Sequence, residues 1–303
     1  MRLLLIAPGY LPYTFSENLC NGKLAYAMYK KGWHVDVLSK VDEGPAYSTE
    51  WTEPWLPLKK NNITITYPVG GKLTRMWDVL RSSVKLGMYP EGGVRWACRA
   101  YELALKLCKE NHYDAVLTRS PSDIPHIIGL RLKEKLGIRW IANWNDPAAP
   151  IWPEPYTHHF SAKEQARRDQ FTRMCLKGAD VNTFPSQSLL DHFTSHYPFL
   201  SELKTEVIPH IALVEDIVPR LKEKLVNDKF RMCHSGNLSV ERNPELTFKA
   251  LRELIDEGFN KMEFSIMGRI NDYTVELVKK YQLEEYVKCI GGFPYMEAIQ
   301  KMQ

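Results

Sequence analysis

The chain has 303 residues, of which 44% are apolar and 25% charged, and its formal net charge is +4. This length allows two domains of ordinary size, and the composition is that of a soluble globular protein. The mild positive charge is compatible with anionic ligands or a membrane surface. Because no RNA- or DNA-binding motif accompanies this charge, we do not expect nucleic acid as a partner. No apolar run is long enough to span a bilayer, and the initial MRLLLIA is too short for a signal peptide, so we interpret it as a buried strand.

None of the six cysteines forms a CxxC pair, and most lie in apolar periodic segments. We therefore expect reduced core cysteines and a cytoplasmic protein. His192 and His196 have the i, i+4 spacing of a metal pair, but no carboxylate lies between them as in a zinc protease. The sequence thus predicts no metal site.

Strand and helix signals alternate along the chain, which predicts an α/β protein with parallel sheets and helices on both faces. In the first part we expect strands at 3–7, 35–38, 63–67, 115–118, 138–143, 181–184 and 206–208. Helices are expected at 18–31, 95–110, 124–136, 161–177 and 188–197. The segments 42–57 and 146–155 are expected loops, and the apolar and basic segment 73–88 is ambiguous.

A linker at 209–228 separates this part from a second one, in which the pattern restarts. Strands are expected at 230–234, 263–267 and 287–290, and helices at 244–257, 272–281 and 295–303. Three strands are fewer than a doubly wound domain normally needs to bury its sheet. The sequence therefore predicts one domain at 1–208 and an incomplete one at 229–303, with a natural C-terminal part missing.

The stretch FRMCHSGNLSVERNPELTFKALREL, residues 230–254, is the most informative local pattern. A strand runs into the turn Ser235-Gly236-Asn237, and Arg242-Asn243-Pro244 precedes a helix. Free backbone N–H groups at such a helix start favour an anion, often a phosphate, and Arg242 would add a charged fork that matches phosphate oxygens. A helix cap and a surface arginine would explain the same spacing equally well.

Four segments together resemble one known family. They are the first strand and helix with KKGWHVDVLS, then YDAVLTRSPSDIPHIIGLRLKEKLGIRWIANWNDPAAPIW, then KGADVNTFPSQSLLDHF with VIPH, and finally residues 230–254 with FSIMGR and VKCIGGFPYMEAI. The chain resembles the family-4 type glycosyltransferases of the GT-B fold, whose two Rossmann-like, doubly wound parallel-sheet domains face each other. The resemblance spans nearly the whole chain.

The resemblance implies transfer of a sugar from a nucleotide-sugar donor to a glycan or lipid-linked acceptor, with retention of configuration. It implies no metal and no cofactor besides the donor substrate, and a role in surface polysaccharide or glycan biosynthesis. The second domain would hold the nucleoside diphosphate and the first the acceptor. Without Mg²⁺, the protein must supply the cations and N–H groups that stabilise the leaving diphosphate.

The resemblance also assigns site residues. Asp146, Arg119 and Ser120 follow first-domain strands and are the expected catalytic residues, with Asp146 accepting a hydrogen bond from a sugar hydroxyl. The expected donor-binding residues are Gly236, Asn237, Arg242, Gly268, Arg269 and Phe293. Ser16 and Asn18 are expected to contact the acceptor or a phosphate. For each, a structural role is the alternative: Ser16 or Asn18 as a helix cap, Asp146 as a turn residue, and Arg119 as an exposed turn arginine.

The sequence departs from the family pattern in three places. Asn237 and Arg242 stand where many relatives have arginine and lysine, Asn145 stands where many have histidine or arginine, and a pair of glutamates seven residues apart would lie beyond Gln303. These departures keep open a non-catalytic nucleotide- or carbohydrate-binding module. A Rossmann oxidoreductase or epimerase is a further alternative, which the missing GxGxxG after the first strand disfavours.

The segment Lys72–Lys109 combines eight lysines and arginines with Trp77, Met88 and Trp96. One interpretation is peripheral contact with the anionic inner face of a membrane, where a lipid-linked acceptor would lie. The other is a helical layer with a solvated basic face.

Overall fold

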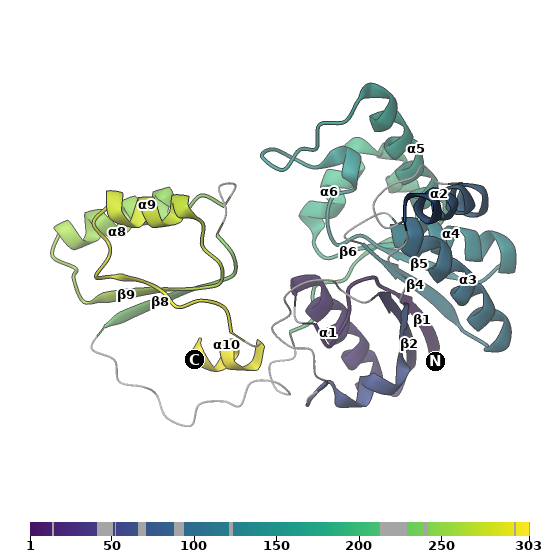
Figure 1. Cartoon of the computed structure of the whole chain (residues 1–303), viewed down its shortest axis with the longest axis horizontal. Coiled ribbons are helices and arrows are strands. Elements are labelled where there is room, and N and C mark those ends of the chain that lie inside the picture. Colours follow the sequence, from purple (N-terminus) through teal and green to yellow (C-terminus); the bar gives the residue numbers. More distant parts are fainter. Residues whose placement is uncertain are drawn as a thin grey trace. The chain divides into compact units, whose positions relative to one another are not determined.

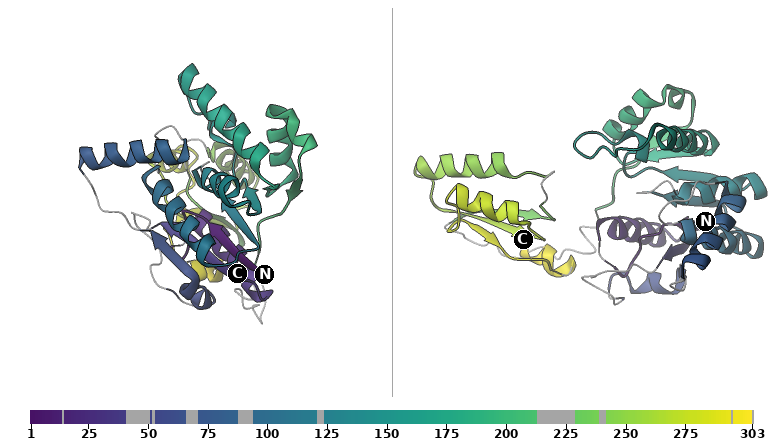
Figure 2. Two further views of the ribbon diagram at one scale, coloured as in Figure 1. Left: turned by 90° about the vertical axis from the view of Figure 1, so that its right-hand side faces the viewer. Right: turned by 45° about the horizontal axis from the view of Figure 1, so that its top comes forward.

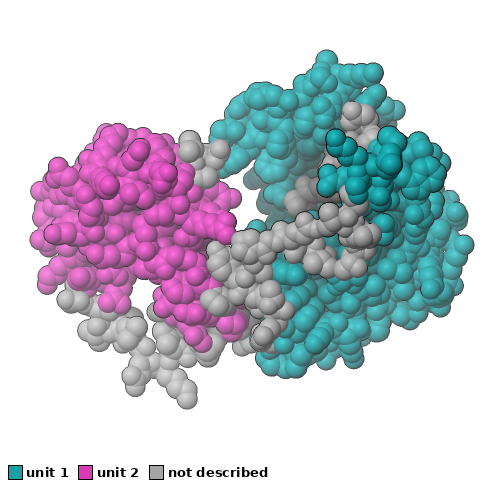
Figure 3. All heavy atoms as spheres, in the orientation of Figure 1, with its two compact units in different colours: residues 1–212 teal, residues 213–303 magenta. Residues whose placement is uncertain are grey.

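The computed structural model describes residues 1–13, 15–40, 51, 53–65, 71–87, 94–120, 124–212, 229–238, 242–293 and 295–302. The chain divides into two compact units, residues 1–212 and 213–303, which Figure 3 colours separately. The division falls inside the predicted linker 209–228, of which residues 209–212 belong to the described part.

Unit 1 is built on a parallel sheet of seven strands in the order β3-β2-β1-β4-β5-β6-β7 (Figure 1). The strands are β1 Arg2–Ile6, β2 His34–Lys40, β3 Asn62–Ile65, β4 Ala115–Arg119, β5 Trp140–Asn143, β6 Val181–Phe184 and β7 Thr205–Val207. The chain leaves β1 toward β2 and returns to β4 on the other side of β1. This reversal of strand order creates a switch point at the carboxyl ends of β1 and β4, where ligands of open α/β sheets bind.

Helices cover both faces of this sheet, with α1 on one face and α3 and α4 on the other (Figures 1 and 2). The helices of unit 1 are α1 Ser16–Lys30, α2 Lys72–Leu86, α3 Val94–Glu110, α4 Ile124–Leu136, α5 Ala162–Gly178 and α6 Gln187–His196. Short 3-10 turns lie at η1 Leu56–Asn61, η2 Ala149–Ile151 and η3 Pro198–Glu202.

The main core of unit 1 contains three fully buried tryptophans, Trp96, Trp140 and Trp144. A Cβ atom at Gly129 of α4 would lie 2.1 Å from Nε1 of Trp140. The close packing of α4 on β5 therefore requires a glycine at this position.

Unit 2 contains a parallel sheet in the order β10-β9-β8, formed by β8 Phe230–Ser235, β9 Met262–Met267 and β10 Val287–Cys289. Its helices are α8 Glu245–Asp256, α9 Asp272–Lys280 and α10 Tyr295–Lys301. Phe248 and Leu251 of α8 pack with Ile266 of β9 and Leu277 of α9 in a separate core. This core holds α8 and α9 on one face of the sheet.

The α/β class with two parallel-sheet units is confirmed. Residues 73–86 of the ambiguous segment 73–88 belong to the helix α2, which Gly87 caps with φ 64, and Met88 lies outside the described residues. One prediction about the cysteines is wrong. Cys233 and Cys289 are exposed, because Cys233 lies on the face of the small sheet opposite α8 and α9 and Cys289 ends the edge strand β10. Within the described residues, no helix combines the length and the apolar character needed to cross a membrane.

Candidate functional site

In unit 2, the turns that follow β8 and β9 meet at two glycines. Gly236 N–H donates to Met267 O over 2.8 Å, and a Cβ atom at Gly268 would lie only 2.0 Å from Gly236 O. Gly236 and Gly268 have φ values of 147 and 151, a region that side-chain-bearing residues rarely adopt. Glycine is therefore needed at Gly268 both for its conformation and for the contact between the two turns.

Asn237 and Arg269 join the same two turns. The Asn237 Oδ1 atom accepts a hydrogen bond of 2.9 Å from Arg269 N, and Leu238 N donates to Arg269 O over 3.1 Å. Gly268 N donates to Gly291 O over 3.0 Å, so the end of β10 belongs to the same surface. The structure thus brings together four of the six predicted donor-binding residues, and uses the Asn237 side chain to hold the turns in place.

The other two predicted donor-binding residues lie farther along the segments that follow β8 and β10. Arg242 is exposed and is followed by Asn243, whose Oδ1 accepts a 2.9 Å hydrogen bond from Glu245 N at the start of α8. Phe293 follows the end of β10 by a short segment, and its ring lies 4.6 Å from Lys301 Nζ of α10. Residues 239–241, between Leu238 and Arg242, lie outside the described residues.

In unit 1, a polar network links the carboxyl ends of β4 and β5 with the start of α1. The Asn145 backbone N–H donates to Ser120 Oγ over 2.8 Å. The Asn145 side-chain amide donates to both carboxylate oxygens of Glu17, over 2.8 and 3.0 Å. Ser120 is buried and fixes Asn145, and Asn145 in turn fixes Glu17. Ser120, a predicted catalytic residue, therefore lies in the network as a positioning residue.

Arg119 is not the exposed turn arginine that the sequence left open, since only 5% of its surface is accessible. Its Nε atom lies 3.7 Å from Glu17 Oε1, and its buried Nε and Nη2 atoms have no hydrogen-bond partner in the described part of the chain. Burial lowers the pKa of Arg119 and raises the pKa of Glu17, and the attraction between the two charges opposes both shifts. Arg119 therefore offers N–H donors toward this end of the sheet.

Asp146 and His210 complete this cluster. Burial raises the pKa of the half-buried Asp146, and the nearby His210 opposes that shift. Burial, and secondly the charge of Arg119, lowers the pKa of His210. Both shifts have burial as their main cause, and the charge of each group opposes the shift of the other.

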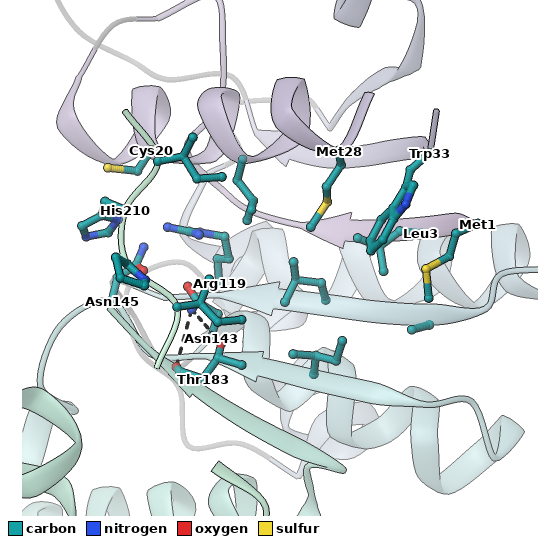
Figure 4. A pocket seen from close by; sticks show the side chains of 17 residues that line it. Met1, Leu3, Cys20, Met28, Trp33, Arg119, Asn143, Asn145, Thr183 and His210 are labelled. Atoms are coloured by element: carbon teal, nitrogen blue, oxygen red, sulfur yellow. Dashed lines mark hydrogen bonds between the residues drawn. The ribbon is translucent and has the colours of Figure 1, made fainter. Parts of the chain in front are cut away.

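A pocket of about 190 Å³ lies beside this cluster, between α1 and the strands β1, β4 and β5 (Figure 4). Arg119, Asn143, Asn145 and His210 lie at one end of the pocket, and Met1, Leu3, Met28 and Trp33 lie at the other. Asn143 donates to Thr183 Oγ1 over 2.8 Å and so is held by β6. The pocket is mostly apolar, with its polar groups at the carboxyl ends of the strands.

The structure gives Ser16 and Asn18 different places. The N-cap residue of α1 is Phe15, without a side-chain cap, so the capping role left open for either residue is wrong. Ser16 is exposed, whereas Asn18 is buried and its amide donates to Tyr10 O over 2.8 Å. With Asn21, whose amide donates to Gly9 O, Asn18 holds the loop after β1.

Sequence reasoning missed Glu17 and His210 as members of the unit 1 cluster. Both stood inside segments that carried the family resemblance, since Glu17 lies between Ser16 and Asn18 and His210 ends the VIPH segment. The signal that could have found them is that Glu17 follows β1 and His210 follows β7 in the sequence. Their proximity to Asn145, Arg119 and Asp146 depends on tertiary packing.

The histidine pair at 192 and 196 makes contacts within the protein. The His192 ring nitrogen Nε2 lies 2.7 Å from Ile151 O, and His196 Nδ1 lies 2.9 Å from His192 O. No group of three His, Cys, Asp or Glu side chains in the described ranges is arranged to hold a metal ion.

Comparisons with known proteins agree on one architecture. HepE from Anabaena, in complex with UDP and glucose, matches 99% of this chain and 71% of its own with a TM-score of 0.61 and 16% identity. The lipopolysaccharide outer core galactosyltransferase WaaB, in its apo form, matches 100% of this chain and 71% of its own with a TM-score of 0.53 and 13% identity. A UDP-N-acetylglucosamine 2-epimerase from Listeria monocytogenes, described as putative, matches 98% and 70% with a TM-score of 0.53 and 13% identity. These likenesses establish the GT-B fold.

No curated protein matches the sequence itself. The model of the family described as Glycosyltransferase Family 4 matches residues 22–211, which is more than half of the chain. The matched range contains β4, β5 and the Arg119, Asn145, Asp146 and His210 cluster. The chain belongs to glycosyltransferase family 4 and is an enzyme of the glycosyltransferase type.

Proposed function

We propose that the chain transfers a sugar from a UDP-sugar to a glycan or lipid-linked acceptor, with retention of configuration and without a metal. The observation that carries the proposal is the surface formed by the joined glycine turns after β8 and β9 in unit 2. A backbone without side chains at these points allows the close approach of a diphosphate. HepE, which shares this fold, is solved with UDP and glucose.

The leaving group of such a reaction is UDP, whose negative charge grows as the glycosidic bond breaks. Without a metal, the charge must be stabilised by protein cations and N–H groups. We assign this role to Arg269, exposed in the turn after β9, and to Arg242, exposed shortly before α8, together with the N–H groups at the start of α8. Phe293 would contact the nucleoside from the end of β10.

The acceptor is assigned to unit 1. Asp146 would accept a hydrogen bond from the acceptor hydroxyl, and Arg119 would donate one to a neighbouring oxygen. Glu17 and Asn145 position Arg119 and the strand ends. The site serves surface polysaccharide or glycan assembly in the cytoplasm, with the segment Lys72–Lys109 in peripheral contact with the inner membrane face.

Isothermal titration calorimetry with UDP, GDP, ADP and NADH tests the donor assignment. We expect UDP to bind and Arg242→Ala to weaken its binding by roughly 1.5–3 kcal/mol, about 10- to 150-fold, because a charge-assisted hydrogen bond is lost. Arg231→Ala is the matched control, since Arg231 is equally exposed but lies near the amino end of β8. An unchanged UDP affinity in Arg242→Ala removes this arginine from the site.

The likeness to the Listeria epimerase supports one second candidate function, the interconversion of UDP-N-acetylhexosamines. Incubation with UDP-N-acetylglucosamine in the absence of acceptor separates the two functions. Epimerised nucleotide sugar in the product mixture contradicts the transferase proposal. Binding of UDP with neither hydrolysis nor epimerisation supports a non-catalytic module.

A further inference from the structure

Helix α2 of unit 1 has its polarity reversed relative to an ordinary surface helix. Five apolar side chains on it are largely exposed: Leu73 by 78%, Met76 by 64%, Trp77 by 65%, Leu80 by 53% and Val84 by 78%. Their spacing places them on one face, within an arc of about 100° around the helix axis. We call this face, defined by these five residues, the α2 stripe.

The opposite face of α2 is buried, and it is polar except at Leu86, which joins the main core at the end of the helix. Asp78 and Ser82 are both buried, and Ser82 Oγ donates to Asp78 O over 2.7 Å. The Asp78 carboxylate accepts a 2.7 Å hydrogen bond from Arg95 Nε of α3 and lies 4.0 Å from Arg99. Rotation of α2 to bury the stripe would leave a carboxylate without these partners, so the ion pairs fix the stripe in its outward orientation.

The charges on α2 are arranged to match an anionic partner. Asp78 is the single acidic residue of the helix and it is buried. Lys72 and Arg75 are exposed in the first turn, and Arg81 and Lys85 form ion pairs with Glu102 of α3. The accessible surface of α2 therefore presents apolar groups and cations. In Figure 2, left, α2 (blue) lies at the rim of unit 1, with one side turned away from the sheet.

We propose that the α2 stripe inserts into the headgroup and upper acyl region of an anionic lipid leaflet, while Lys72 and Arg75 contact lipid phosphates. This deepens the membrane contact included in the proposed function by assigning it to one helix face. The stripe protrudes rather than forming a groove, and it holds a tryptophan and a methionine beside cations, a combination suited to a soft, negatively charged interface. A second copy of the chain would instead place these cations against each other.

Vesicle co-sedimentation with the full chain tests the proposal. We expect binding to vesicles of equal parts phosphatidylglycerol and phosphatidylcholine, and much weaker binding to phosphatidylcholine alone. Leu73→Ser with Leu80→Ser should weaken binding roughly tenfold or more, because both side chains leave the apolar region. Lys72→Gln with Arg75→Gln should weaken it roughly 30-fold on anionic vesicles only. Leu246→Ser, which changes the similarly exposed Leu246 of α8, is the matched control and should leave vesicle binding unchanged.

Trp77 supplies a direct readout. All eight tryptophans lie among the described residues, and Trp77 is the one that is mostly exposed. Brominated acyl chains should quench the fluorescence of the wild-type chain and leave that of Trp77→Phe unchanged. Equal binding by the double-serine variant and the wild type would overturn the proposal. So would a wild-type dimer in size-exclusion chromatography that the double-serine substitution makes monomeric.

UDP titration of the same variants separates this proposal from the function it rests on. Loss of vesicle binding with unchanged UDP affinity supports the stripe as a membrane contact. UDP binding by a wild type that ignores anionic vesicles overturns the stripe proposal and leaves the transferase proposal standing. Vesicle binding that depends on the stripe, in a chain that binds no nucleoside diphosphate, contradicts the transferase proposal alone.

Discussion

Acidification should destabilise unit 1 through His126, a histidine buried at the centre of its core. The side chain is fully buried on α4, its Nδ1 lies 2.8 Å from Thr118 Oγ1, and its ring centroid lies 4.1 Å from that of Trp144. Protonation places an N–H on both ring nitrogens, and Nε2 has no hydrogen-bond partner in the described part of the chain. Burial accordingly lowers the pKa of His126 to about 3.

The magnitude follows from linkage. In the unfolded chain a histidine has a pKa of about 6.5, so between this value and about 3 the unfolded state binds a proton that the folded state rejects. The stabilising contribution of neutral His126 is complete above the unfolded pKa and is lost as the pH falls through this window. Each pH unit costs about 1.4 kcal/mol, so unfolding at pH 5 should be easier by about 2 kcal/mol than at pH 7.5.

Urea unfolding followed by tryptophan fluorescence measures this loss for unit 1 alone, since all eight tryptophans precede residue 213. His126→Leu removes the titration and should remove about 2 kcal/mol of the difference between pH 7.5 and pH 5. His210, whose pKa is also lowered, titrates in both proteins and cancels in the comparison. Parallel pH dependence of the wild type and His126→Leu would refute the reasoning.

Two further predictions test the turns of unit 2 and the network of unit 1. Gly268→Ala should destabilise unit 2 by about 1–3 kcal/mol or more and abolish UDP binding in calorimetry, because its Cβ would clash with Gly236 O. Gly258→Ala, which has φ 98 but open space around its Cβ, should retain UDP binding, and equal losses in both variants would argue against the clash. Asn145→Asp should place a carboxylate against Glu17, raise the pKa of Glu17 further and make unit 1 less stable than the wild type by about 1–3 kcal/mol at pH 7, and this difference should shrink as the pH falls. A destabilisation of Asn145→Asp relative to the wild type that does not shrink on acidification contradicts the role of Asn145 as a donor to Glu17.

The alternating strands and helices could be predicted from the sequence because periodicity and turn residues are local. The segment at 73–88, which the sequence left ambiguous, shows the limit of such reasoning. Its apolar residues have helical spacing, but in a soluble protein that spacing normally marks a buried face. The ion pair from Asp78 to Arg95 of α3 reverses the orientation, and no local pattern contains that information.

In the candidate site, too, some features could be predicted from the sequence and others could not. Gly236 and Gly268 follow strands, and adjacent parallel strands bring their ends together, so their proximity was predictable from position. The use of Asn237 as the acceptor for Arg269 N was not, because the sequence does not state which partner a side-chain amide finds. In unit 1, Arg119 was predictable as a strand-end cation, and its burial was not. Arg119 becomes covered by α1 and comes near Glu17 only when this helix packs on the sheet.

Burial of Arg119 also links its chemical role to Glu17. A guanidinium that leaves water loses solvation, and a carboxylate 3.7 Å away offsets part of that loss. Asn145 holds Glu17 in place, and Ser120 holds Asn145, so the surroundings of Arg119 depend on side chains that make no contact with a ligand in this assignment. Glu17 and Asp146 both carry raised pKa values, and Glu17 is raised in part by the charge of Asp146. Loss of Arg119 would therefore favour protonation of Glu17 and, through their coupling, would change the carboxylate that is assigned to the acceptor hydroxyl. On the proposed assignment, the acceptor side depends on the charge balance of Glu17, Arg119 and Asp146 rather than on any one of these residues.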